Sequence, residues 1–94
     1  MLYAIMSEDV LDSAALRKTV RPAHIARLEA LRDEGRLAIA GPFPVIEGEG
    51  VTGSLVVAEF NDYQEALQWA NTDPYVDAGV YAKVVVKPFR QVLP

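Results

Sequence analysis

Two stretches of this chain are apolar on both alternating faces, and this pattern restricts the folds that the chain can adopt. Every residue is apolar in Leu37–Ala40 and in Leu55–Ala58, and Val84–Val86 repeats the pattern over a shorter length. A strand with one face in water alternates apolar and polar residues instead. We therefore expect strands here whose sheet is covered on both faces.

Glycine, proline and capping residues divide the chain into four strands and two main helices. We expect strands at residues 2–7, 37–43, 54–60 and 81–89. The first main helix should run from Pro22, at its first position, to about Glu34, with Gly35 as its stop. The second should follow a cap at Asn61 or Asp62 and end near Ala70. Residues 44–53 show neither the helical nor the strand pattern of apolar residues, and we expect them to form a loop.

Two shorter features complete the pattern. Residues 8–20 connect the first strand to the first main helix. Within them, Asp12 or Ser13 can cap a short helix over residues 14–19. Asp73 and Pro74 should begin a further short turn, which Gly79 ends.

The resulting βαββαβ order predicts an α+β fold of the ferredoxin-like type, with a four-stranded antiparallel sheet. Right-handed crossovers place both main helices on one face of the sheet. The 94 residues suffice for one domain, residues 1–94, and not for two. Two helices leave the other sheet face bare, and a second copy of the chain is its simplest cover. We therefore expect a homodimer that packs sheet face to sheet face.

Composition excludes several classes of function. Hydrophobic residues make up 51% of the chain, yet no apolar run is long enough to span a membrane and no signal peptide is evident. A formal net charge of -4 argues against nucleic-acid binding. The absence of cysteine excludes thiol redox chemistry and fits a cytoplasmic setting. No metal or nucleotide motif is present, so we expect neither a metal nor a cofactor.

His24 is the only histidine and the first candidate for chemistry. Histidine is the default group for proton transfer near neutral pH. At 3.6 residues per turn, Leu28 and Leu31 lie about 40° and 20° to either side of it, so it should point toward the core. Placed in the first helical turn, it would also meet the positive end of the helix dipole, which disfavours the protonated ring. A purely structural histidine is the alternative interpretation.

Asp73 is the second candidate. An aspartate before Pro74 commonly caps a short helix. A carboxylate can also orient an imidazole and stabilise its protonated form. Asp73 and His24 lie on helical connections on the same side of the sheet, so contact between them is possible. Both roles can hold at once.

Arg17 and Arg21 precede His24 and form a basic cluster with Lys18. Guanidinium groups match carboxylates, so we expect the two arginines to bind a small anionic molecule. The alternative is that these basic residues form surface ion pairs with Glu8, Asp9 or Asp12. We expect such pairing more for Lys18 than for the arginines.

Ser54 can donate a hydrogen bond but lacks the context of a catalytic nucleophile.

Several motifs resemble those of a known family, in the same order and over nearly the whole chain: Arg21-Pro22-Ala23-His24, Gly35-Arg36-Leu37, Ala40-Gly41-Pro42, Gly53–Phe60, Asp73-Pro74-Tyr75, Ala78-Gly79-Val80-Tyr81 and Val86-Lys87-Pro88-Phe89. With these motifs the chain resembles the YCII-related (YciI-like) family. The resemblance implies a dimeric α/β-barrel, related to muconolactone isomerase, with an active site around a histidine and an aspartate that correspond to His24 and Asp73. Most of the family has no assigned activity. A few relatives act in the breakdown of chlorinated aromatic compounds, by dehydrochlorination or related hydrolysis.

Two hypotheses of different class follow. The first is a small cofactor-free enzyme in which His24 and Asp73 form a catalytic acid/base pair. Arg17, Arg21 and Ser54 would then bind a small anionic substrate, such as an enol, a lactone or a product of chlorinated aromatics. The rival is a non-catalytic module for ligand binding or dimerisation. Haem ligation by His24 is a third possibility that nothing else in the chain supports.

Overall fold

The predicted order of elements is confirmed by the computed structural model, which describes residues 1–94. The strands are β1 (Leu2–Asp9), β2 (Leu37–Pro44), β3 (Val51–Glu59) and β4 (Tyr81–Phe89). The helices are α1 (Ala14–Asp33), α2 (Tyr63–Asn71) and the single-turn α3 (Pro74–Asp77). None of the three helices is both long enough and apolar enough to cross a membrane.

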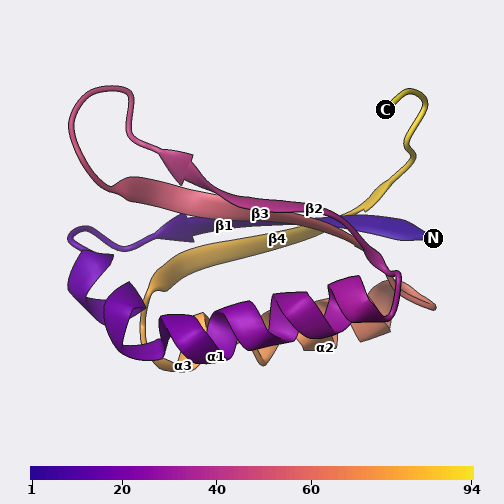
Figure 1. The fold of residues 1–94 in the computed structure, drawn as a ribbon, viewed down its shortest axis with the longest axis horizontal. Coiled ribbons are helices and arrows are strands. Elements are labelled where there is room, and N and C mark those ends of the chain that lie inside the picture. Colours follow the sequence, from indigo (N-terminus) through magenta and orange to yellow (C-terminus); the bar gives the residue numbers. More distant parts are fainter.

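The four strands form one sheet in the order β2-β3-β1-β4, and every neighbouring pair is antiparallel. All three helices lie on one face of this sheet (Figure 1). The arrangement is the α+β, ferredoxin-like fold that the sequence predicts. A buried cluster fills the space between the two layers and consists of Tyr3, Ile5, Leu31, Val56, Ala58, Phe60, Ala66, Ala70 and Val86.

Helix α1 runs through Pro22 instead of beginning there, so the prediction of two separate helices is wrong. Proline has no N–H, and within a helix it deprives the carbonyl four residues earlier of its partner. That carbonyl belongs to Lys18, and both Lys18 and Pro22 are exposed, so water can replace the lost bond. The first turns of α1 are inclined to the rest of the helix (Figure 1), as expected near a proline.

Polar contacts to Asp9 hold the first turns of α1 in place. Ser13 stands at the N-cap position, but its hydroxyl caps no backbone N–H and donates to Asp9 Oδ2 at 2.6 Å. Arg17 donates to the same carboxylate through Nε at 2.6 Å and Nη2 at 2.9 Å. Asp12, the other predicted cap, adopts a left-handed conformation with φ 57° in the preceding turn. Tethering to the end of β1 thus compensates for the interruption at Pro22.

The hairpin between β2 and β3 is longer than predicted, because pairing extends to Pro44 and Val51 and shortens the loop expected at residues 44–53. Gly53 lies within β3 and not before it. A Cβ atom at this position would collide with the backbone carbonyl of Ser7 on β1. The close approach of the two strands therefore requires glycine here, and it brings Ser54 beside Ser7.

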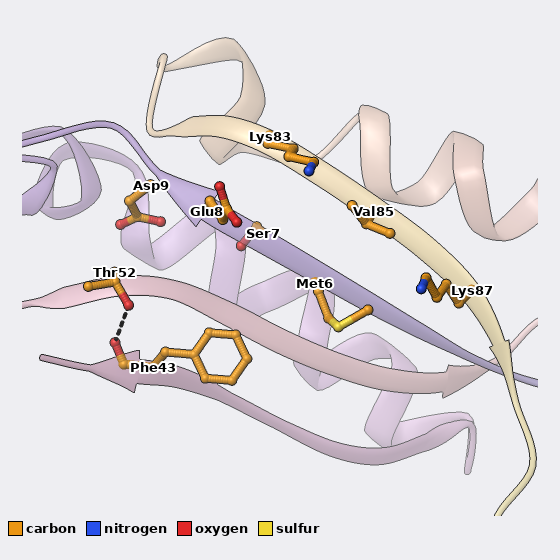
Figure 2. A pocket seen from close by; sticks show the side chains of 9 residues that line it. All are labelled: Met6, Ser7, Glu8, Asp9, Phe43, Thr52, Lys83, Val85 and Lys87. Atoms are coloured by element: carbon orange, nitrogen blue, oxygen red, sulfur yellow. Dashed lines mark hydrogen bonds between the residues drawn. The ribbon is translucent and has the colours of Figure 1, made fainter. Parts of the chain in front are cut away.

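The sheet face opposite the helices is open. Strand pairing places Ile39 beside Val57 and Phe89 beside Leu2, and Ile39 and Phe89 remain 57% and 42% exposed. The C-terminal tail rises on the same side (Figure 1). Figure 2 shows the other end of this face, where Phe43 lies near a hollow lined by Met6, Val85, Lys83 and Lys87. An apolar open face is the feature from which the sequence predicts a second copy.

We propose that two copies of the chain pack through this face. One charged residue introduced on the face should then dissociate the dimer. Ile39→Lys places an ammonium group on the open face, where Ile39 is 57% exposed. We expect light scattering to give the mass of a dimer for the parent protein at micromolar concentration and that of a monomer for the variant.

Leu16→Lys is the matched control, because Leu16 is 39% exposed on α1, which lies on the other side of the sheet from the open face (Figure 1). This control should remain dimeric. A monomeric parent protein, or equal behaviour of the two variants, would contradict the proposed packing.

Candidate functional site

His24 lies in the middle of α1, which begins at Ala14. The expectation that the helix N-terminus acts on its ring is therefore wrong, because the helix dipole is felt only within the first turn. The predicted direction of the side chain is right, since His24 is 6% exposed and faces the interior with Leu31. Helical periodicity alone therefore predicts the direction of the His24 side chain, even though the predicted start of the helix is wrong.

His24 and Asp73 meet, although 49 residues separate them in the sequence. Nδ1 of His24 lies 2.9 Å from Oδ2 and 3.0 Å from Oδ1 of Asp73. The two side chains are only 7% and 5% exposed, so water does not compete for the contact. A carboxylate can only accept, so Nδ1 carries the proton and donates it. This contact therefore fixes the orientation of the imidazole ring.

The other ring nitrogen, Nε2, has no partner within the protein. Nη1 of Arg27 is the only fully buried side-chain nitrogen or oxygen that lacks a hydrogen bond. An unpartnered Nε2 must consequently reach solvent, and His24 lines a cavity where it can do so. In the neutral ring Nε2 presents a lone pair, and in the protonated ring it presents an N–H. The geometry suits either acceptance or donation of a proton.

Asp73 is itself held by three groups. It is the N-cap of α3, where Oδ1 accepts a hydrogen bond of 2.8 Å from the backbone N–H of Tyr75. Its other oxygen lies 3.6 Å from Nη1 of Arg27. The two roles weighed for Asp73 from the sequence, cap and partner of the imidazole, therefore occur together in the structure.

Arg27 is a charged neighbour that the sequence analysis missed. Its guanidinium lies 4.4 Å from the centre of the Trp69 ring, and Nη2 donates to the Trp69 carbonyl at 2.8 Å. Burial lowers the pKa of Arg27, and the charge of Asp73 opposes that shift. Arg27 follows His24 by three residues, a spacing that places both on one helix face. That spacing was the available signal.

Tyr75, which the sequence presents only as part of the Asp73-Pro74-Tyr75 motif, forms one side of the site. Its ring stacks on the imidazole of His24, with centroids 4.0 Å apart and planes inclined by 12°. The guanidinium carbon of Arg17 lies 4.9 Å from the Tyr75 ring centre. Tyr75 is 1% exposed, so this stack cannot shift without disturbing the core. The imidazole is thus fixed by a ring face as well as by a hydrogen bond.

A cavity of about 240 Å³ opens beside His24, between α1 and the hairpin of β2 and β3. Small-molecule sites commonly measure ~300–1,000 Å³, so this cavity suits a small ligand. Polar groups enter it from Arg17, Arg21, His24 and Ser54, and the remaining lining is largely apolar. The structure thus brings all four of these predicted residues to one cavity, with Asp73 behind His24.

The two arginines differ in what already binds them. Arg17 forms a two-point ion pair with Asp9, whose side chain is 1% exposed. Burial alone lowers the pKa of Arg17, but the hydrogen bond and charge of Asp9 outweigh it, and the net pKa is raised. Lys18 makes no ion pair, so the expectation that it pairs in preference to the arginines is wrong. Arg21 is exposed and also has no ion-pair partner.

Ser54 belongs to a chain of hydroxyl groups beneath the cavity. Its Oγ lies 2.7 Å from Ser7 Oγ and 3.0 Å from the hydroxyl of Tyr81. The backbone N–H of Ser54 also donates to Ser7 Oγ at 3.1 Å. Burial raises the pKa of Tyr81, and burial likewise raises that of Tyr75. These hydroxyls therefore keep their protons well above neutral pH.

A second hollow, of about 630 Å³, lies on the open face of the sheet (Figure 2). Lys83 and Lys87 reach it from β4 and Glu8 from β1, but no hydrogen-bonded acid/base pair lines it. Nowhere in the structure do three or more histidine, cysteine, aspartate or glutamate side chains form a group that could hold a metal ion. The cavity beside His24 is therefore the stronger candidate site.

These features define an α+β protein of ferredoxin-like topology with a buried His–Asp pair at a small cavity. The YCII-related domain matches residues 1–90, and the chain belongs to that family. Protein YciI of Escherichia coli O6:H1 is 53% identical over 97 residues, which cover 98% of this chain and 99% of that protein. An uncharacterized protein of Haemophilus influenzae is 48% identical over the same shares of the two chains.

One solved structure of known activity shares the fold. It is 5-chloro-2-hydroxyhydroquinone dehydrochlorinase of Burkholderia phenoliruptrix, in complex with 2,5-dihydroxybenzoquinone. The two chains superpose with a TM-score of 0.84 at 26% sequence identity, covering 96% of this chain and 94% of that one. The chain is thus similar over nearly its full length to an enzyme.

The two roles of Asp73 can be separated by their effect on stability. Asparagine caps a helix about as well as aspartate, whereas alanine cannot cap, a loss of about 1 kcal/mol. We expect Asp73→Ala to lower the free energy of unfolding by roughly that amount more than Asp73→Asn does. Chemical denaturation measures both. Equal destabilisation would show that the cap on Tyr75 contributes nothing.

The raised pKa values of Tyr75 and Tyr81 predict a loss of stability in alkali. Folding favours the neutral phenols, so their contribution is complete below the ordinary tyrosine pKa of about 10 and is lost as pH rises above it. We expect the free energy of unfolding to fall more steeply between about pH 9 and pH 11 in the parent protein than in Tyr81→Phe. Parallel slopes in denaturation experiments would contradict the burial of the Tyr81 hydroxyl.

Proposed function

We propose that this protein is a small enzyme in which His24 transfers a proton at the cavity and Asp73 positions it. One observation carries the proposal. Nδ1 of His24 is bound by a buried carboxylate, while Nε2 has no partner and borders a cavity. A structural histidine would be expected to satisfy both ring nitrogens within the fold. Here one nitrogen is left for a ligand.

Proton transfer at Nε2 follows a simple sequence. The lone pair of Nε2 takes a proton from the substrate, and the imidazolium that forms is stabilised by the Asp73 carboxylate. Return of the proton to another atom of the substrate completes an isomerisation. Departure of a leaving group such as chloride completes an elimination, and Nε2 then releases its proton to water. Asp73 acts through His24 and is a positioning residue.

The cavity favours a small anionic substrate. Arg21 provides an exposed positive charge at its rim, and Ser54 provides a hydroxyl group. Apolar residues on α1 and β2 complete the walls, including Ile25, Leu28 and Pro42. An enol, a lactone or a hydroxylated ring derived from chlorinated aromatics has the required combination of charge and apolar surface. The dehydrochlorinase of similar fold acts on such a ring, which supports the same reaction class here.

The test is turnover of a panel of chlorinated hydroxyquinols, enol acids and lactones by the parent protein and its variants. His24→Gln removes the proton-transfer group, and we expect kcat to fall by about 10²–10⁴-fold. Asp73→Asn keeps the helix cap but removes the charge that stabilises the imidazolium, so kcat should fall with little change in KM.

Lys18→Gln is the control, because Lys18 lies on α1 but does not line the cavity. It should leave kcat unchanged. Undiminished turnover in both His24→Gln and Asp73→Asn would refute the mechanism. Binding of panel compounds without turnover by the parent protein would favour the rival function, a non-catalytic ligand-binding module.

A further inference from the structure

The charges around the cavity are unequally balanced. Arg17 is paired with Asp9 through two hydrogen bonds of 2.6 and 2.9 Å. Arg27 lies 3.6 Å from Asp73, which it shares with the imidazole. Arg21 alone among the arginines near His24 has neither an ion pair nor a hydrogen bond within the protein. The cavity therefore carries one uncompensated positive charge.

We propose that the cavity selects ligands with a single negative charge and that Arg21, not Arg17, binds that charge. The inference rests on the proposed function in that it concerns the same cavity, and it adds the charge of the substrate. It also assigns the two arginines different roles, whereas the sequence alone treats them as equivalent.

Arg17 is unsuited to bind a ligand charge because Asp9 already neutralises its charge and engages two of its three nitrogens. Nε and Nη2 point to Asp9, and the pair is nearly buried, with side chains 14% and 1% exposed. Removing Arg17 from Asp9 would leave a buried carboxylate without a partner, which is strongly unfavourable. Its guanidinium instead lies over the ring of Tyr75, which in turn stacks on His24. Arg17 is accordingly a positioning residue.

A second negative charge on a ligand would find no unpaired positive charge. Besides Arg21 the polar lining consists of Arg17, which Asp9 already neutralises, the His24 ring and the Ser54 hydroxyl. An unpaired charge that loses water against the remaining, largely apolar lining is disfavoured. The volume of about 240 Å³ corresponds to about eight waters at ~30 Å³ each, enough for one substituted ring. Arg21 precedes His24 by three residues, so the charge and Nε2 can be reached by one small molecule.

Three single-ring probes test this assignment: benzoate with one charge, phthalate with two, and benzamide with none. Calorimetry at low ionic strength measures their binding. We expect the parent protein to bind benzoate at least tenfold more tightly than benzamide, and phthalate no more tightly than benzoate. Arg21→Gln should weaken benzoate at least tenfold, and Arg21→Lys should restore most of the affinity.

Lys18→Gln is the matched control, since it removes the same charge from the same exposed stretch of α1 outside the cavity. It should change benzoate affinity by less than twofold. Equal weakening by both glutamine variants, tighter binding of phthalate than of benzoate, or no binding of benzoate would each overturn the inference.

Failure of the charge assignment can be distinguished from failure of the proposed function. His24→Gln should lower kcat by about 10²–10⁴-fold while leaving benzoate binding within a few fold of the parent protein. Loss of turnover in His24→Gln together with unchanged binding in Arg21→Gln would overturn the charge assignment alone. Normal turnover in His24→Gln together with weakened binding in Arg21→Gln would refute only the proton-transfer mechanism.

Discussion

The contact between His24 and Asp73 is the interaction on which the rest of the site depends. It joins the middle of α1 to the start of α3, two segments that lie far apart in the sequence. The same carboxylate caps α3 and thereby places Tyr75 on the imidazole face. One buried aspartate therefore sets the position of a helix, a stacked ring and the free nitrogen Nε2. Preorganisation of this kind lets a small fold hold an imidazole in one fixed orientation.

Two contacts between a partly buried arginine and a buried carboxylate support this arrangement from either side. Arg27 lies against Asp73 and the face of Trp69, and Arg17 lies between Asp9 and Tyr75. Each of these two guanidinium groups is matched by one carboxylate, whereas Arg21 lines the same cavity without an ion-pair partner. This difference is the basis for proposing different roles for neighbouring arginines on one helix.

Much of the fold could be predicted from local pattern. Doubly apolar strands and the alternation of elements fixed the topology, and the period of α1 turned His24 inward. The continuity of α1 could not be predicted, because it depends on Asp9 holding Ser13 and Arg17, a tertiary contact that overrides the local preference at Pro22. Arg27 was missed for a related reason. Its importance comes from Asp73, a residue that only the folded chain brings beside it.

The central claim is that Asp73 holds the imidazole of His24 so that Nε2 is free at the cavity. Nitrogen-15 NMR of the single histidine tests this directly, at a pH at which the ring is neutral. The account predicts a proton on Nδ1 and a lone pair on Nε2 in the parent protein, and a mixture of tautomers when Asp73 is changed to alanine. A proton on Nε2, or a solvent-like mixture in the parent protein, would contradict the account.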